Sequence, residues 1–63
     1  MKMDFLKMDK NMFFSIVNMK LRDEFDSIEE FCSYYDIDLE DIKEKMNSFN
    51  MKYYSDINQI KML

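Results

Sequence analysis

The sequence predicts a single, mainly α-helical domain in which three helices of helix-turn-helix type precede a small β-hairpin. A chain of 63 residues is enough for one domain, although it buries only about 60% of the surface of its unfolded state. Three segments carry apolar residues at helical spacing behind side chains that favour helix N-termini, and the last segment changes to the alternation of strands. The predicted parts are an N-terminal extension at 1–8, helices at 9–23, 27–35 and 38–49, and a β-hairpin at 51–62.

The first helix is marked by its start. Asp9 is a good N-cap, and Met8 and Phe13 occupy the two positions of a hydrophobic staple. Residues 1–8 have no comparable signal, and they fit an extra strand, an extension of the helix or a disordered tail. The apolar residues that follow the cap share one face of a helix: Phe13, Ile16, Val17 and Leu21.

The second and third helices form the helix-turn-helix motif, over residues 27–46. Ser27 and Glu30 have the spacing of a capping box, and Asp38 is the expected N-cap of the third helix. Cys32 is a small residue at the point where the two helices cross closely. We therefore expect Cys32 to be structural.

The chain contains no glycine, so a left-handed backbone position must be taken by Asn or Asp, the next most tolerant residues. Asp36 stands in the turn of the motif, where this pattern usually has glycine. Asn50 follows the third helix at the C′ position. Further turn or helix-end positions are expected at Asn47, Asp56 and Asn58.

A three-helix unit followed by a hairpin is a winged-helix layout, whose usual function is to bind DNA with the second helix of the motif. Residues 23–44 carry ten acidic residues against one lysine, a net charge of −9, whereas residues 1–22 have a net charge of +3. DNA-binding proteins gain affinity by neutralising phosphates with Lys and Arg, so this charge argues against DNA binding through the motif. Carboxylates also stabilise the positive end of a helix dipole. Those at the start of this helix are Asp38, Glu40, Asp41 and Glu44.

The composition gives catalysis little support. There is no histidine, so the commonest general base near neutral pH is missing, and Cys32 has no histidine to activate it. There is no glycine-rich loop to hold phosphates and no ligand set for zinc or calcium. We therefore expect no enzyme, no cofactor and no metal site.

The composition also bears on the cellular compartment. A single cysteine cannot form an intramolecular disulfide, which is typical of proteins in a reducing interior. No segment approaches the run of about 18 apolar residues that a membrane helix needs. Asp4 and Asp9 interrupt the apolar residues of the N-terminus, which excludes a signal-peptide core. We expect a cytoplasmic protein that has no membrane segment.

The segment from Asn18 to Asp23 is the most specific stretch of the chain. Arg22 is the only arginine, and we expect bidentate pairing of its guanidinium with a carboxylate or with helix-end carbonyls. Asn18 lies beside the apolar face and is expected to hydrogen-bond a neighbouring loop. The alternative for Asn18, Lys20 and Arg22 is contact with a partner.

Four groups of residues carry a resemblance to a known family: Met12 to Ser15, Val17 to Asp23, Ser27 to Cys32, and Tyr53 with Asn58 and Gln59. Over roughly residues 8–60 the chain resembles a bacterial family of domains of unknown function, the family numbered 4250. That family commonly has proline where this chain has Lys10 and glycine where it has Asn50, which suits the first position of a helix and a C′ position. The resemblance implies a compact cytoplasmic bacterial protein and supplies no activity, ligand or catalytic residue.

These observations favour a non-enzymatic binding module that acts through contacts with a protein partner or with a second copy of the chain. The candidate contact residues are Asn18, Lys20, Arg22, Glu40, Asp41 and Glu44. The alternative is a DNA-binding transcriptional regulator of winged-helix type that binds through basic residues outside the motif helix: Lys7, Lys10, Lys20, Arg22, Lys52 or Lys61. A third hypothesis, an acidic DNA-mimicking inhibitor, rests only on the charge of residues 23–44.

Overall fold

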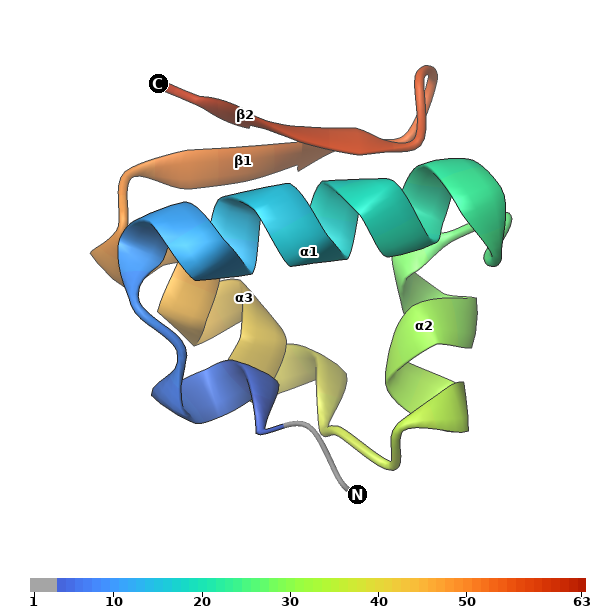
Figure 1. The fold of residues 1–63 in the computed structure, drawn as a ribbon, viewed down its shortest axis with the longest axis horizontal. Helices are drawn as coiled ribbons and strands as arrows, with labels where there is room; N and C mark the ends of the chain where they lie inside the picture. Colours follow the sequence, from blue (N-terminus) through green and yellow to red (C-terminus); the bar gives the residue numbers. More distant parts are fainter. Residues whose placement is uncertain (1–3) are drawn as a thin grey trace.

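The computed structural model describes residues 4–63 and confirms a mainly helical domain with a β-hairpin (Figure 1). A short 3₁₀ helix precedes three α-helices, and two antiparallel strands follow them. The elements are η1 (Phe5–Lys7), α1 (Lys10–Asp23), α2 (Ile28–Tyr34), α3 (Leu39–Ser48), β1 (Met51–Tyr54) and β2 (Gln59–Met62).

The three predicted N-caps are confirmed, and each helix begins one residue after its cap. An Asp9 carboxylate oxygen accepts a hydrogen bond from the Met12 amide at 2.8 Å. The Ser27 hydroxyl accepts one from the Glu30 amide at 3.1 Å. The Asp38 carboxylate accepts one from the amide of Glu40 at 3.0 Å. Each bond satisfies a backbone N–H that has no partner within its helix, which is why the caps fix the helix starts.

The left-handed backbone positions fall on Asp and Asn, as a chain without glycine requires. Asp36, Asn50 and Asn58 have φ angles of 56°, 58° and 51°. Asp36 follows α2 in a Schellman arrangement, in which the amide of Ile37 donates to the carbonyl of Cys32 at 2.8 Å. Asn47 lies at the end of α3, as the second-to-last residue of that helix, but it keeps a helical backbone and has no positive φ.

The predicted turn position of Asp56 is confirmed, since it lies in the hairpin loop, but it has no positive φ. The loop has four residues, 55–58, because Tyr54 pairs with Gln59. The left-handed position of this loop falls on its last residue, Asn58, directly before β2. One such position is enough to return the chain into the second strand.

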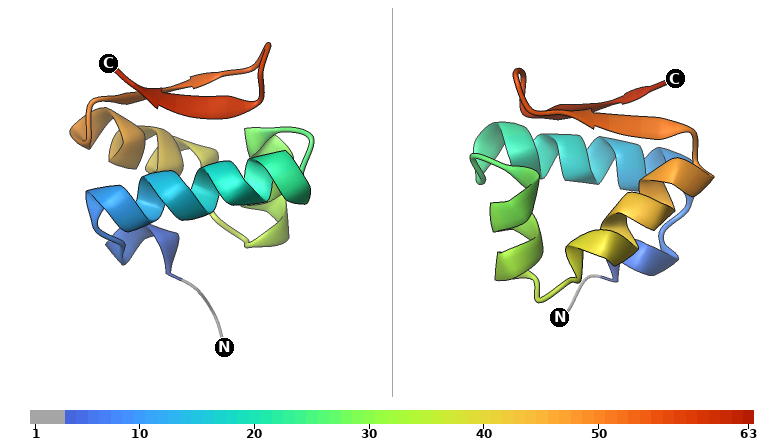
Figure 2. Two further views of the ribbon diagram at one scale, coloured as in Figure 1. Left: turned by 45° about the horizontal axis from the view of Figure 1, so that its top comes forward. Right: turned by 180° about the vertical axis from the view of Figure 1, so that it is seen from behind.

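The hairpin covers one side of the helical unit, as Figures 1 and 2 show. β2 packs against α1, and β1 packs against α3, while α2 contacts both of the other helices. The core lies between these layers. Its side chains with the least exposure come from every element except β1: Phe5, Phe13, Val17, Leu21, Phe31, Ile42 and Ile60.

Phe5 shows that the N-terminal extension belongs to the fold. Its side chain is fully buried, and its ring meets those of Phe31 and Tyr35 edge-to-face at centroid distances of 4.8 and 4.9 Å. A strand, a continuation of α1 and a disordered tail are all wrong for the segment Phe5–Lys7, since this aromatic contact holds it as a separate 3₁₀ helix. Residues 1–3 of the predicted extension lie outside the described residues.

None of the helices in the described part of the chain has the length and apolar character required to cross a membrane.

Candidate functional site

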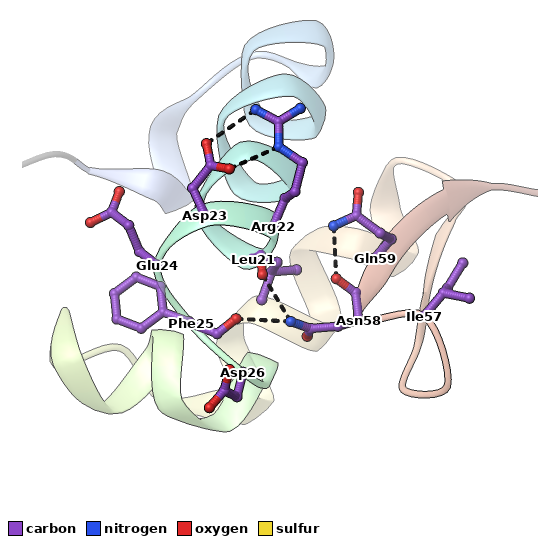
Figure 3. Close-up of a pocket in the computed structure, with 9 residues that line it drawn as sticks. All are labelled: Leu21, Arg22, Asp23, Glu24, Phe25, Asp26, Ile57, Asn58 and Gln59. Carbon is purple, nitrogen blue, oxygen red and sulfur yellow. Dashed lines mark hydrogen bonds and ion pairs between the residues drawn. The ribbon is translucent and has the colours of Figure 1, made fainter.

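A pocket with a volume of about 650 Å³ lies where the end of α1 meets the turn of the hairpin (Figure 3). Three segments form it: the last turn of α1, the loop to α2 and the end of the hairpin loop. The lining residues are Leu21, Arg22, Asp23, Glu24, Phe25, Asp26, Ile57, Asn58 and Gln59. Two groups of residues that carry the resemblance to the family, Arg22–Asp23 and Asn58–Gln59, therefore come together here.

Asn58 joins the hairpin to the helices at this pocket. Its amide nitrogen donates to the carbonyl of Leu21 at 2.9 Å and to the carbonyl of Phe25 at 2.8 Å. Its amide oxygen accepts from the Tyr53 hydroxyl at 2.7 Å. The carbonyl of Leu21 lies in the last turn of α1, where backbone carbonyls have no N–H partner within the helix. By donating to it, Asn58 also caps the C-terminus of α1. Figure 3 shows both bonds to the carbonyls.

Tyr53 is held in the protonated form that this network needs. Burial raises the pKa of its phenol, with the backbone N–H of Ile28 acting in the opposite direction. The neutral phenol is the donor in the bond to Asn58. Neither Tyr53 nor Asn58 was predicted to have this role, since only the turn at Asn58 was visible in the sequence.

Asn18 pairs with β2 as if it were a neighbouring strand. Its amide nitrogen donates to the carbonyl of Ile60 at 2.9 Å, and its amide oxygen accepts from the amide of Ile60 at 2.7 Å. The expected hydrogen bond from Asn18 is therefore formed, but to a strand and not to a loop. Gln59 adds a donor to the carbonyl of Asn18 at 3.2 Å. These bonds use the side chain of Asn18 within the fold.

Lys20 is also engaged within the fold. Its ammonium group bonds Glu24 at 2.7 Å, and only 18% of its side chain is exposed. The hydrogen bond to Glu24, followed by the one to Tyr35, raises the pKa of Lys20. Lys20 therefore pairs with the C-cap residue of its own helix.

Arg22 forms the predicted bidentate pair, and its partner is the adjacent Asp23. The two N···O distances are 2.9 and 3.1 Å, and the side chains are 70% and 51% exposed. The hydrogen bonds raise the pKa of Arg22 and lower that of Asp23. Unlike Asn18 and Lys20, this pair faces solvent and contributes little to the packing of the domain.

The other three candidate residues lie away from this pocket. Glu40, Asp41 and Glu44 are exposed on α3, so the fold does not bring them together with Asn18, Lys20 and Arg22. Glu40 and Asp41 belong to the first turn of α3, where the helix dipole favours negative charge. Glu44 lies one turn further along and extends the acidic surface.

A second pocket, of about 360 Å³, lies beside these acids between η1 and the turn of the motif. Its carboxylates come from Asp4, Asp36, Asp38 and Asp41. Over residues 4–63 no group of three or more His, Cys, Asp or Glu side chains is arranged to hold a metal ion. The same pocket has aromatic and aliphatic walls, including Tyr35 and Ile37.

Cys32 has the properties of a structural residue. It is buried in the core, and burial, followed by the charges of Glu29 and Asp38, raises the pKa of its thiol to about 11. The thiolate is the reactive form of cysteine, so a thiol with this pKa is inert near neutral pH.

Taken together, the geometry defines a small helix-turn-helix domain whose hairpin is anchored to α1 by Asn18 and Asn58. The family model for a domain of unknown function (DUF4250) matches residues 7–60, and the chain belongs to this family. Neither the curated proteins nor the solved structures compared with this chain include a match. The residues behind the resemblance, among them Asn18, Tyr53 and Asn58, form the hydrogen bonds that hold the hairpin in place.

Proposed function

We propose that this domain is a non-enzymatic binding module that acts through protein contacts, in the cytoplasm of a bacterium. The observation that carries the proposal is the exposed acidic surface formed by Glu40, Asp41 and Glu44 on α3. None of these three carboxylates forms an ion pair within residues 4–63. The ion pairs of that region join Lys7 with Asp4, Lys20 with Glu24, and Arg22 with Asp23. An unpaired acidic helix surface suits a basic protein partner and repels nucleic acid.

Exposed apolar side chains support the same class of function. The exposed fraction is 72% for Tyr34, 47% for Ile57 and 50% for Met12. Aromatic residues and methionine are enriched in the centres of protein interfaces. The buried free thiol of Cys32 supports a reducing compartment.

The proposal is tested by affinity capture from a lysate with the immobilised domain, combined with light scattering of the pure protein. A triple variant, Glu40→Gln with Asp41→Asn and Glu44→Gln, removes the acidic surface. A control with Asp26→Asn, Glu29→Gln and Glu30→Gln removes the same number of charges around the start of α2. We expect wild type and control to retain a specific protein that the α3 variant loses. A strict monomer that retains no protein would contradict the proposal.

One observation favours the alternative function, a DNA-binding regulator of winged-helix type. Lys52 and Lys61 lie directly opposite each other in the hairpin and are both exposed. Like charges in this position destabilise a hairpin, so a phosphate bound between them would stabilise it. Titration with duplex DNA at low and at moderate salt decides between the functions. DNA that fails to bind even at low salt excludes the alternative.

A further inference from the structure

A groove of about 300 Å³ lies between α3 and β1, and Tyr53, which donates to Asn58, forms part of its lining. We call it the α3–β1 groove. Its floor is apolar, from Ile28, Met46, Met51 and the ring of Tyr53, and its rims carry Lys43 and Lys52. The volume is at the lower end of the range of about 300–1,000 Å³ that is typical of ligand sites, which is enough for one large side chain of a partner.

The two lysines of the rim lack acidic partners in the described part of the chain. The ion pairs found over residues 4–63 involve other cations, although the sequence has thirteen acidic residues. Glu40 precedes Lys43 by three residues on α3, a spacing that permits an ion pair, and none forms. Lys52 has only the ring of Tyr54, with its ammonium group 5.6 Å from the ring centroid.

A third lysine adds to this local positive charge. Lys61 pairs with Lys52 across the hairpin, so the two side chains lie on the same face of the sheet. Of these three lysines, Lys43 and Lys52 line the groove, on a domain whose net charge is −4. The negative charge of Glu29 helps to raise the pKa of Tyr53, but Glu29 itself does not line the groove. The charge around the groove favours an anionic occupant.

The floor favours an occupant with an apolar anchor. Met46 and Met51 are almost fully buried, with exposed fractions of 5% and 3%, so the floor consists of core side chains at the bottom of an open groove. Methionine has three rotatable bonds, which allow these two side chains to reshape around an inserted group. Nucleic acid would neutralise the lysines but leave this apolar floor unused.

We infer that the α3–β1 groove binds a short acidic protein segment that inserts one apolar side chain between flanking carboxylates. The inference rests on the proposed function, a binding module for proteins, and it assigns a surface and a class of partner to it. The apolar anchor fills the space above Met46 and Met51. The carboxylates pair with Lys43 and Lys52.

The test is an NMR titration of the ¹⁵N-labelled full chain with three synthetic hexapeptides. The probe has a central Leu-Phe pair flanked on each side by two acidic residues. One control replaces the acidic residues with lysines, and the other replaces Leu-Phe with Ser-Ser. We expect the probe alone to shift the amide signals of Lys43, Met46, Met51, Lys52 and Tyr53.

Two pairs of variants separate the charge of the rim from the shape of the groove. The double variant Lys43→Glu with Lys52→Glu should weaken binding of the probe by about tenfold, since it replaces two attractive surface charge contacts with repulsive ones. Its control, Lys7→Glu with Lys10→Glu, has the same net charge and leaves the groove intact. Asn47→Tyr fills the groove without changing its charge and should also abolish the shifts, whereas Ser48→Tyr, a neighbour that does not line the groove, should not.

Each other outcome overturns the inference. Groove signals that stay unchanged, or that respond equally to the basic peptide, exclude an acidic segment. Shifts caused by duplex DNA and not by the probe identify a nucleic-acid surface. Shifts caused by raising the protein concentration alone identify a second copy as the occupant. A lysate protein that the α3 acidic surface still captures, together with a silent groove, would leave the proposed function standing and refute only this assignment.

Discussion

Asn58 shows how much of this fold depends on single polar side chains. It adopts a left-handed backbone, caps α1 through the carbonyl of Leu21, and holds the Tyr53 hydroxyl. Asp36 and Asn50 also adopt the left-handed backbone, just after α2 and α3, where glycine is usual. In the absence of glycine, short polar side chains tolerate the left-handed conformation at a cost of about 1–2 kcal/mol each.

Replacing Asp36 with glycine should therefore stabilise the domain. We expect a gain of about 0.5–1 kcal/mol, because the relief of the left-handed cost exceeds the extra entropy of glycine in the unfolded chain. In a domain of this size such a gain raises Tm by about 3–6 °C in a thermal melt. Asp36→Asn separates the effect of charge from that of the backbone, and Asp56→Gly, at a position without positive φ, should give no gain. An equal gain from Asp56→Gly would refute this explanation.

The thiol of Cys32 should remain unreactive until the domain unfolds. At neutral pH a disulfide reagent such as Ellman's should modify it only at the rate of unfolding, and at once in guanidinium chloride.

Burial raises the pKa of the Cys32 thiol in the folded state from 9.0 to about 11, so the unfolded chain loses the proton first and stability falls as pH rises from about 9 to 11. The Cys32→Ala variant provides the control, because it should lack this component of the alkaline loss. Rapid modification of the native protein at pH 7 would contradict the structure.

Among the elements, the hairpin depends on α1 more than on its own two strands. Four-residue strands are marginal when isolated. Here the edge of β2 is closed at Ile60 by the side chain of Asn18, which satisfies both backbone groups of that residue. The same contact blocks an edge that would otherwise be open to pairing with another strand.

Replacing Asn18 should loosen the hairpin before it unfolds the helices. Asn18→Ala leaves a part-buried amide and carbonyl of Ile60 without partners, at a cost of about 2–3 kcal/mol. Asn18→Asp keeps the acceptor and loses the donor, so its effect should be intermediate. Amide hydrogen exchange provides the measurement, with Ile60 losing protection ahead of the α1 amides. Asn11→Ala, at an exposed position of the same helix, should leave exchange at Ile60 unchanged.

The whole molecule is small enough that one aromatic residue near the N-terminus can decide whether it folds. At about 0.05–0.15 kcal/mol per residue, a chain of this length has a stability of roughly 3–9 kcal/mol. Phe5 is fully buried and touches two other aromatic rings. Loss of a buried Phe typically costs about 3–5 kcal/mol, which is comparable with the whole stability.

We therefore expect Phe5→Ala to populate the unfolded state at 37 °C, as followed by circular dichroism and denaturant titration. Leu6→Ala, at the neighbouring half-buried position, should cost much less and leave the domain folded. A Phe5→Ala domain that keeps the stability of wild type would show that η1 is dispensable.

At the scale of the whole molecule, acidic and basic side chains meet around α3. The acidic residues Glu40, Asp41 and Glu44 lie on α3 together with Lys43, whereas Lys52, the other lysine of the α3–β1 groove, lies on β1. The motif helix of a DNA-binding protein would carry basic residues where Glu40, Asp41 and Glu44 lie here. The scaffold is thus that of a helix-turn-helix domain, while α3 carries acidic residues at these positions.

The sequence by itself determined the helices, their caps and most of the left-handed positions, because these depend on neighbours within about four residues. Asp9, Ser27 and Asp38 cap the helices that their local patterns predict. The acidic surface of α3 and the pairing of Arg22 with a carboxylate could also be predicted, since charge order along a helix is visible in the chain.

Only the tertiary structure decided how these elements are joined. The bonds of Asn18 to Ile60 and of Asn58 to Leu21 connect residues that are 42 and 37 positions apart, and their partners are backbone groups. Backbone partners leave no pattern in the sequence, and neither does the burial of Phe5 against the rings of Phe31 in α2 and of Tyr35 directly after it. The α3–β1 groove is likewise a product of packing, because it exists only where a helix and a strand meet.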